Sequence, residues 1–404
     1  MLLLRNQIQP YAWGRLDGMS DLVGTEPSGG PEAELWVGTH PSAPSIVVGD
    51  PEGQTLAEVI ASDPARWLGP VLAGRGWTSL PFLLKVLSIG EPLSLQAHPS
   101  AAQARDGYDR ENEAGIPLDA PQRTYRDPSA KPESLVALRE TWALCGFRTA
   151  VESRELVAGL GLGDLSPLID ALDLPDQPTA LEGALSWILG VAGPKRSALS
   201  AAAVAAAERM ASGCAGDPYR WVVNLGHQHP GDLGCLAPLL VDLVRLAPGD
   251  AVHLPAGNLH AYLSGAGVEI MAASDNVLRG GLTPKYIDTV ELLHILRFEP
   301  GVPPAPIETN PAPGMTAYDC GEDAFRLAVI DASSDAHRFT PEGPSLLLAT
   351  GGPVRVTDDG GSVELSAGRA AFVPAGSGEL EVIGPGRLWW ATVGSELLSP
   401  CERR

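Results

Sequence analysis

One motif occurs twice in the chain, and this repeat limits the fold more than any other feature. The motif is Gly, five residues, Pro-x-Gly, two residues and then a polar side chain. Its copies lie 119 residues apart and comprise Gly249, Pro255, Gly257 and His260, then Gly368, Pro374, Gly376 and Glu379. A Pro-Gly turn between short apolar stretches is typical of two β-strands joined by a tight turn. One copy could arise by chance in a chain with 46 Gly and 37 Pro, but two copies with the same spacing predict two similar hairpins.

The spacing also indicates what the histidine does. It is that of the second cupin motif, in which a strand, a turn and a returning strand aim a His at a metal inside a barrel. The first cupin motif is matched by Gly90, five residues and Gln96-x-His98, with Gln in the place of the first His. Residues i and i+2 of a strand share a face, so the Gln96 amide oxygen and a His98 nitrogen can meet His260 in one barrel interior. One such His alone is as often a packed core residue as a ligand, but the two motifs together predict a divalent metal site. The second copy has Glu379 instead of His.

This donor set lacks a negative charge. A divalent ion held only by neutral Gln and His would keep its full charge in a low-dielectric interior, so a carboxylate is needed. Glu133 is the candidate, because Pro132 before it favours an extended entry into a strand. Spacing alone leaves open that Glu133 is an exposed side chain.

Residue types divide the chain into parts. Short apolar segments with Gly and Pro between them predict strands over 45–50 and 80–87, and again from 239–246 to the C-terminus. In between, Ala, Leu and Glu at helical spacing predict helices over 153–160, 180–189 and 196–210.

We therefore expect a mainly β protein with two cupin-type jelly-roll barrels and an α-helical insert. A chain of 404 residues is long enough for several packed units. The expected units are a catalytic metal-binding unit of residues 1–148 and 236–300, a helical insert of 149–235 and a C-terminal unit of 301–404 without metal. The last boundary lies in a Pro-rich stretch at 300–313.

Composition argues against several partners. The net charge of −21 opposes binding to phosphate backbones and anionic lipid surfaces, so we expect no nucleic acid and no membrane partner. An anionic metabolite could bind only where Lys and Arg converge. Five scattered cysteines without a Cys-x-x-Cys pair fit a reducing cytoplasm, and the N-terminal apolar run is too short for a signal peptide. We expect a soluble cytoplasmic protein that is a monomer or a weak homo-oligomer.

Several segments resemble those of type I phosphomannose isomerases. They are Pro10–Gly14, Glu34–Pro41, Pro92–Pro99, Lys131–Glu133, His260–Leu263 and Ser274–Lys285. Several of these are specific to that family rather than to cupins at large. The resemblance implies one zinc ion per chain, bound by Gln96, His98, Glu133 and His260, and so decides in favour of Glu133. It also implies reversible isomerisation of mannose 6-phosphate and fructose 6-phosphate by proton transfer between C1 and C2 through an enediolate.

The resemblance also assigns residues to the substrate, a small sugar phosphate. Arg279 would lie over the reacting end and stabilise the developing negative charge. Lys131 and Lys285 are expected to contact the substrate, and Ser94 could add a hydroxyl from the strand face that carries Gln96. For each Lys or Arg the alternative is a solvated surface charge.

One departure from the family concerns the proton carrier. Family members usually have Asn-His before Lys-Pro-Glu, and that His is a proposed proton-transfer group, whereas this chain has Ser129 and Ala130. Alanine cannot move a proton, so the candidates are Glu269, Lys131 and metal-bound water. Burial on a strand would raise the pKa of Glu269 toward neutrality, but a structural salt bridge is an equal alternative.

The same departure supports a second hypothesis, a non-catalytic or weakly active sugar-phosphate-binding protein. A third hypothesis, an iron-dependent cupin oxidoreductase, fits a His-rich barrel, but Gln96 and Arg279 suit isomerisation better.

Other histidines are weaker candidates. His227 and His229 have ligand-like spacing but precede a Pro-Gly turn, which favours solvent exposure. His40 and His253 lie in strand-like segments, where each could support a metal ligand or simply pack in the core.

Overall fold

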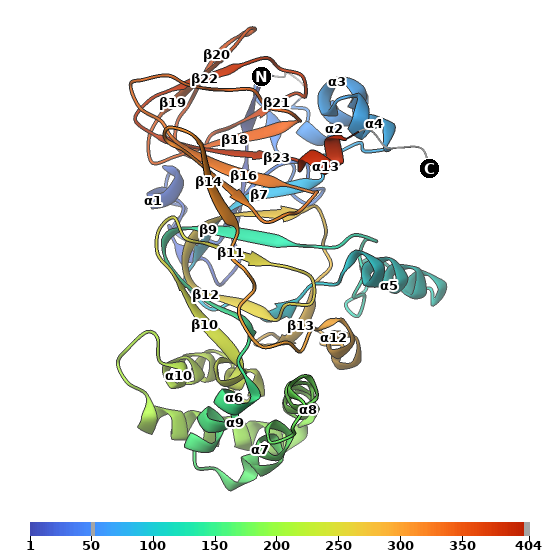
Figure 1. Ribbon diagram of the computed structural model, residues 1–404, viewed down its shortest axis with the longest axis vertical. Helices are drawn as coiled ribbons and strands as arrows, with labels where there is room; N and C mark the ends of the chain where they lie inside the picture. The colour runs from blue at the N-terminus through green and yellow to red at the C-terminus, as the bar shows by residue number, and fades with distance from the viewer. Residues whose placement is uncertain (50–52, 400–404) are drawn as a thin grey trace.

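A computed structural model describes residues 1–49 and 53–399 and shows an elongated molecule (Figure 1). The C-terminal strands lie at the top of this view, a second set of strands lies in the middle, and the helices of 150–228 lie at the bottom. The protein is mainly β, as predicted. In the part of the chain that the structure describes, no helix is both long and apolar enough to cross a membrane.

The middle layer is a nine-stranded sheet, counted over the described residues. Its centre is formed by β12, which pairs antiparallel with both β7 and β9. Its strands are β2 (Gln7–Gln9), β5 (Glu34–Val37), β7 (Phe82–Ile89), β8 (Leu95–Ala97), β9 (Glu133–Phe147), β10 (Val241–Leu246), β11 (Ala251–Leu254), β12 (His260–Ala272) and β13 (Leu278–Gly281). All eight residues of β7 are buried, as expected for a strand covered on both faces. The strand predicted over 80–87 is therefore present, two residues further along.

Helices follow β9 and pack on one another below the middle sheet. They are α6 (Ala150–Gly159), α7 (Ser166–Leu172), α8 (Gln177–Gly190), α9 (Gly193–Met210) and α10 (Pro218–Gln228). Local signals start them: Thr149 and Glu152 form a capping box at α6, and Asp176 caps α8. The strand predicted from residue 239 begins only at Val241, because Pro238 occupies the first turn of a short helix, α11 (Ala237–Leu240).

An eight-stranded sheet and a four-stranded sheet form the upper part of the described structure. The eight strands are β14 (Ile307–Ala312), β15 (Met315–Asp319), β16 (Arg326–Asp331), β23 (Arg387–Thr392), β18 (Ser345–Thr350), β21 (Ala370–Val373), β1 (Leu2–Arg5) and β6 (Ile46–Val47). The four are β17 (His337–Phe339), β22 (Leu380–Ile383), β19 (Val354–Asp358) and β20 (Gly361–Leu365). Thus β1 and β6, which lie inside the range expected for the metal-binding unit, pair within the C-terminal sheet.

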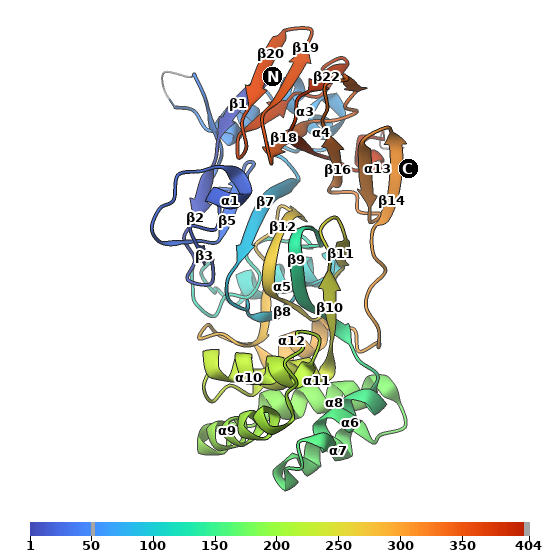
Figure 2. The same cartoon turned by 90° about the vertical axis from the view of Figure 1, so that its left-hand side faces the viewer.

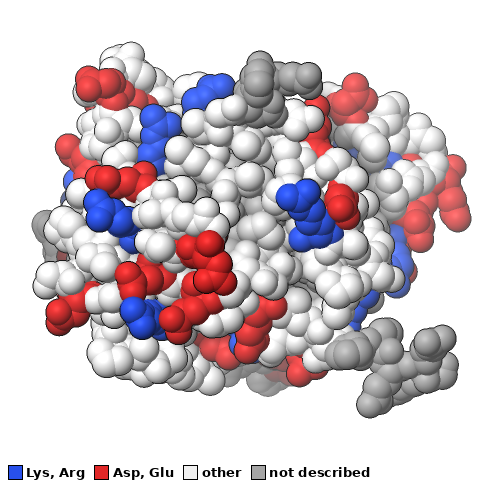
Figure 3. All heavy atoms as spheres, turned by 90° about the horizontal axis from the view of Figure 1, so that it is seen from above, with Lys and Arg blue, Asp and Glu red and all other residues white. Residues whose placement is uncertain are grey.

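Shorter elements lie around these sheets. They are α1 (Ser20–Val23), α2 (Leu56–Ser62), α3 (Pro64–Leu68), α4 (Pro70–Gly74), α5 (Ala101–Glu113), α12 (Thr289–Ile295), α13 (Ser395–Leu398), β3 (Arg15–Leu16) and β4 (Pro31–Glu32). Seen from above the C-terminal strands, Asp and Glu side chains gather in several places, whereas Lys and Arg side chains lie apart from one another (Figure 3).

Both copies of the repeat form a strand, a turn and a second strand (Figure 1), and β11 and β12 of the first copy are also seen in Figure 2. Gly257 and Gly376 have φ of 78° and 76°, a left-handed backbone that glycine adopts without steric cost. The prediction of hairpins was wrong, however. Among the described residues no ladder joins β11 to β12 or β21 to β22, because β11 pairs with β9, β21 pairs with β1 and β18, and β22 pairs with β17 and β19. The first turn therefore joins two strands that both pair with β9, and the second joins strands of two different sheets.

Candidate metal centre

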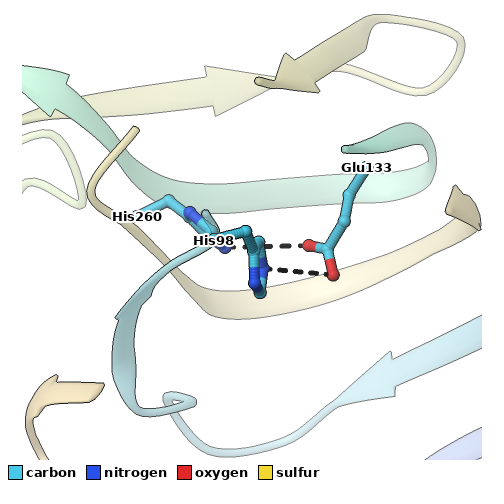
Figure 4. A group of neighbouring side chains, drawn as sticks. All are labelled: His98, Glu133 and His260. Carbon is cyan, nitrogen blue, oxygen red and sulfur yellow. Dashed lines mark ion pairs between the residues drawn. The ribbon is translucent and has the colours of Figure 1, made fainter. Parts of the chain in front are cut away.

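Three buried side chains converge in the middle layer (Figure 4). His98 follows β8 directly, Glu133 is the first residue of β9, and His260 is the first residue of β12. Glu133 Oε1 lies 3.3 Å from His98 Nε2, and Glu133 Oε2 lies 3.7 Å from His260 Nε2. The ligand atoms all lie within 4.8 Å of one another, and none of the three residues is more than 2% exposed. This group can hold one metal ion.

Main-chain carbonyls orient both imidazoles. His98 Nδ1 donates to the carbonyl oxygen of Asn276 at 2.8 Å, and His260 Nδ1 donates to that of Asn258 at 3.0 Å. Each bond places the ring hydrogen on Nδ1 and leaves the Nε2 lone pair facing the carboxylate. This is the arrangement in which a histidine ligates a metal through Nε2.

Burial and Lys131 set the charges of the group. Burial alone would raise the pKa of Glu133, but Lys131, whose ammonium contacts Glu133 Oε1, and His98 hold that pKa well below its usual range. Burial, with Lys131 as the next cause, lowers the pKa of His98. Burial, with His98 as the next cause, lowers the pKa of His260 to about 4. At neutral pH the group is thus one carboxylate and two neutral imidazoles, the protonation state that binds metal.

Gln96 lies at the edge of this group. It is in register with His260 across β8 and β12, and its Nε2 lies 3.4 Å from His260 Nε2. A half-turn of the amide presents Oε1 at the same place, and that oxygen is the amide atom that can ligate a cation.

Two buried atoms of the group are left without a hydrogen bond. His98 Nε2 and Glu133 Oε2 have no hydrogen-bond partner, although both are shielded from solvent. Unsatisfied polar atoms in an interior cost free energy, and a cation between them would remove that cost. The donor set therefore fits a metal of the zinc type, which prefers imidazole and carboxylate ligands.

A buried lysine that the sequence analysis missed lies on β7. Lys85 Nζ lies 3.5 Å from Glu34 Oε2 and 3.3 Å from Glu269 Oε2, over the ring of Trp36. Burial alone would lower the pKa of Lys85, but Glu34 and Glu269 raise it. Burial and the charge of Glu133 raise the pKa of Glu269 to about 7, against the effect of Lys85. Glu269 therefore combines the two properties that the sequence left as alternatives, a near-neutral pKa and a buried ion pair.

Three basic side chains, Arg126, Arg279 and Lys285, lie near one another. Arg279 on β13 is in register with Gln96 on β8. Burial and the charge of Arg126 lower the pKa of Arg279, and burial, Arg279 and Arg126 lower that of Lys285. Within residues 1–49 and 53–399, none of these three cations forms an ion pair with a carboxylate. Their charges are available to an anion, and Arg126 is one that sequence reasoning missed.

Known proteins are similar to this chain in both sequence and fold. A family model for the type I phosphomannose isomerase catalytic domain matches residues 1–150. The mannose-6-phosphate isomerase of Escherichia coli strain K12 is 36% identical over 394 residues, which cover 96% of this chain and 98% of that protein. The chain belongs to the type I phosphomannose isomerase family. The resemblance predicted from motifs is thus confirmed.

More distant family members and solved structures agree. The mouse (Mus musculus) mannose-6-phosphate isomerase is 32% identical and covers 86% of this chain. Phosphomannose isomerase from Salmonella typhimurium, solved bound to substrate (f6p) and a metal atom (zn), is 32% identical with a TM-score of 0.88. The match covers 97% of this chain and 99% of the Salmonella chain.

The loop that departs from the family pattern is fixed by one buried amide. Asn276 Oδ1 accepts from the Arg126 backbone N–H at 2.7 Å, and its Nδ2 donates to the carbonyl oxygens of Asp127 and Ser129 at 2.7 and 2.9 Å. Ala130 follows in this loop. The residue that orients His98 therefore also fixes the backbone where family members usually carry a histidine. The sequence placed Asn276 in a family segment but gave it no role.

The remaining singled-out residues lie around the group or away from it. Ser94 is half-buried directly before β8, not within the strand as expected. His40 accepts from the Ser42 backbone N–H and bonds Asp275 at 3.1 Å, so both its nitrogens are occupied. His227 is exposed and pairs with Glu208, away from the three ligands. His229 is the capping residue directly after α10.

His253 lies on β11 and contacts the C-terminal part of the chain. Burial alone would lower its pKa, but hydrogen bonds to Cys320 and Glu322 raise it to about 9. It does not belong to the metal group.

Proposed function

We propose that this chain is a zinc-dependent isomerase that interconverts mannose 6-phosphate and fructose 6-phosphate. The observation that carries this proposal is the buried donor set of His98, Glu133 and His260, with both Nε2 atoms turned toward the carboxylate. Family membership supports it, because a relative of almost equal length is a mannose-6-phosphate isomerase and a related structure holds substrate (f6p) and zinc. The non-catalytic alternative is not favoured, since Ala130 is its one support.

Gln96, His98, Glu133 and His260 would hold one zinc ion. The single carboxylate would offset part of the metal charge, and the amide and imidazoles would leave the rest to act on the substrate. Bound there, zinc would act as a Lewis acid on a substrate oxygen that becomes negative during the reaction.

The three cations would bind and orient the anionic substrate. Arg126 and Lys285 are exposed and suit the phosphate, whereas half-buried Arg279 lies beside Gln96 and suits the reacting end. Arginine keeps its charge throughout, so Arg279 would stabilise the enediolate oxygen without losing a proton. Lys131, next to Glu133, and Ser94, before β8, would contact the sugar oxygens.

Glu269 is our candidate for the proton carrier between C1 and C2. A carboxyl with a pKa of about 7 can accept a carbon-bound proton at neutral pH and return it to the neighbouring carbon. Lys85 would hold this side chain in place through their ion pair. Lys131 is the second candidate, and either would explain activity with Ala130 in the place of the usual histidine.

We further propose that the strands form two cupin-type jelly-roll units and that 149–235 is an insert between strands of the first unit. The pairing of β1 and β6 with C-terminal strands supports assigning these two strands to the second unit rather than the first. In this organisation the second unit binds no metal, because Glu379 replaces the histidine of its motif. We expect a cytoplasmic protein, monomeric or weakly self-associating, without nucleic-acid or membrane partners.

A coupled assay tests the function directly. Zinc-loaded protein should convert mannose 6-phosphate to fructose 6-phosphate well above a Glu133→Ala control, and equal rates would refute the proposal. Arg126→Ala should raise KM about 10- to 100-fold, the effect of about 1.5–3 kcal/mol from one lost charged hydrogen bond. Arg209→Ala, an exposed change on α9, is the matched control. Calorimetric binding of the sugar phosphate without hydrogen exchange at C1 or C2 would favour the binding-protein alternative.

A further inference from the structure

His253 lies behind the strand that carries Glu133. On the ladder between β11 and β9 it is opposite Ser134. Its Nδ1 lies 3.0 Å from the main-chain carbonyl oxygen of Glu133 and 3.0 Å from Ser134 Oγ. Because successive side chains on a strand point to opposite faces, Ser134 and His253 lie on the face opposite the Glu133 side chain. His253 thus contacts the backbone of a metal ligand from outside the metal group.

The other ring nitrogen of His253 contacts the C-terminal part of the chain. His253 Nε2 lies 3.3 Å from Glu322 Oε1, and Glu322 lies in the loop between β15 and β16. The Glu133 carbonyl oxygen and the Glu322 carboxylate oxygen are both acceptors, whereas the Ser134 hydroxyl can donate or accept. The two ring nitrogens of His253 therefore connect Glu322 to the backbone of Glu133.

The loop that holds Glu322 is fixed on the C-terminal side of that residue. The carbonyl oxygen of Asp323 accepts from the Gly394 backbone N–H at 2.9 Å. Phe325 is 1% exposed and shares an apolar core with Val136 of β9 and Ala251 of β11. The Glu322 carboxylate is thus held by a loop that packs on the same apolar core as β9. Through His253 this carboxylate reaches the first residue of β9.

We propose that Glu322 is a positioning residue for the metal ligand Glu133 and acts through His253. The chain of contacts from Glu322 to His253 to the Glu133 carbonyl holds the first residue of β9 in place, so that its carboxylate faces His98 and His260. This assigns the C-terminal sheet, which has no metal motif of its own, a part in metal retention. The proposal rests on the metal site of the proposed function but not on the isomerase activity.

Zinc release tests this inference. Zinc-loaded wild type, Glu322→Gln and Glu322→Ala are mixed with an excess of a chromophoric chelator, and the rate of zinc transfer is followed by absorbance. Glu322→Gln keeps the shape of the side chain and removes its charge, so it should fold as the wild type does. Glu381→Gln is the control, because Glu381 forms an exposed ion pair with Arg338 on the four-stranded sheet.

Residues that support metal ligands typically change metal affinity by roughly 10- to 100-fold when they are replaced. We expect release about tenfold faster for Glu322→Ala, a smaller acceleration for Glu322→Gln, and the wild-type rate for Glu381→Gln. Both Glu322 variants should also lower kcat more than they change KM. Release at the wild-type rate from both variants would overturn the inference and leave the isomerase proposal intact. A wild-type protein that retains no zinc would overturn both.

Discussion

The most informative single change is Lys85→Met, which removes the cation between two buried carboxylates. At an effective dielectric constant of about 20, each pair at these distances attracts by about 5 kcal/mol. Burial costs all three groups solvation, so the net loss is smaller than this sum. It also has an upper limit, because a carboxyl left without its cation can take up a proton, and the other of the two, Glu269, with a pKa of about 7, is already partly protonated in the wild type. At pH 7 that protonation costs about 3–4 kcal/mol, the gap between the pH and an ordinary Glu pKa.

This limit gives the prediction its pH dependence. In Lys85→Met, the carboxyl without a cation has a folded-state pKa above its unfolded value. The stability lost by protonating it is therefore absent below the unfolded pKa and grows as the pH rises. The loss should therefore fall from about 3–4 kcal/mol at pH 7 to about 1.5 kcal/mol at pH 5.5. At about 2–4 °C per kcal/mol, Lys85→Met should lower Tm by about 6–15 °C at pH 7 and by about 3–6 °C at pH 5.5.

Thermal unfolding of the two proteins at both pH values measures the effect. Lys195→Met is the control, because Lys195 is exposed on α9 and such a change usually alters stability by less than about 0.5 kcal/mol. The reasoning is refuted if Lys85→Met lowers Tm no more than Lys195→Met does. It is equally refuted if the loss is as large at pH 5.5 as at pH 7.

Three further predictions concern the metal and the proton carrier. Glu133→Gln removes the one carboxylate of the donor set and leaves Lys131 buried without its partner. The purified variant should therefore contain less than a tenth of the wild-type zinc by mass spectrometry. A zinc content equal to that of the wild type would contradict the ligand assignment. If Glu269 is the base, kcat should fall as the pH drops through about 7, the pKa of that carboxyl, and Glu269→Gln should abolish this limb of the profile; an unchanged profile would point to Lys131. Ala130→His should change kcat by less than about tenfold, well below the 10²–10⁴ that a recruited general base supplies, and a larger gain would mean that the chain lacks a carrier of its own.

Local spacing predicted the parts of the site that depend on local backbone geometry. Gln96 lies in β8 and His98 directly follows that strand, and His260 follows a turn whose glycine has a left-handed backbone, so each position has a short-range signal. Helices α6, α8 and α9 were predicted for the same reason, because periodic apolar residues act within a few turns, whereas α7 and α10 were not predicted.

The features that sequence reasoning missed depend on residues far apart in the chain. Lys85 stands in an apolar run, and that charge was a signal, but its partners Glu34 and Glu269 come from β5 and β12. The anchoring amide of Asn276 joins the loop between β12 and β13 to the loop before β9. The pairing of β1 with β21 has no local signature either, because short apolar strands can pair with many others until the tertiary fold selects one.

The placement of β1 has a consequence for how the protein is made. Leu2 pairs with Phe372, so the first strand to leave the ribosome finds its partner only after about 370 further residues. At about 5–20 residues per second, that wait is roughly 20–70 s. Throughout this time the apolar strand β1 can pair with wrong partners. A fragment of residues 301–404 made alone would have an uncovered edge at β21. The upper sheet is thus completed last, and production of the C-terminal part as a separate fragment should fail unless residues 2–5 and 46–47 are supplied.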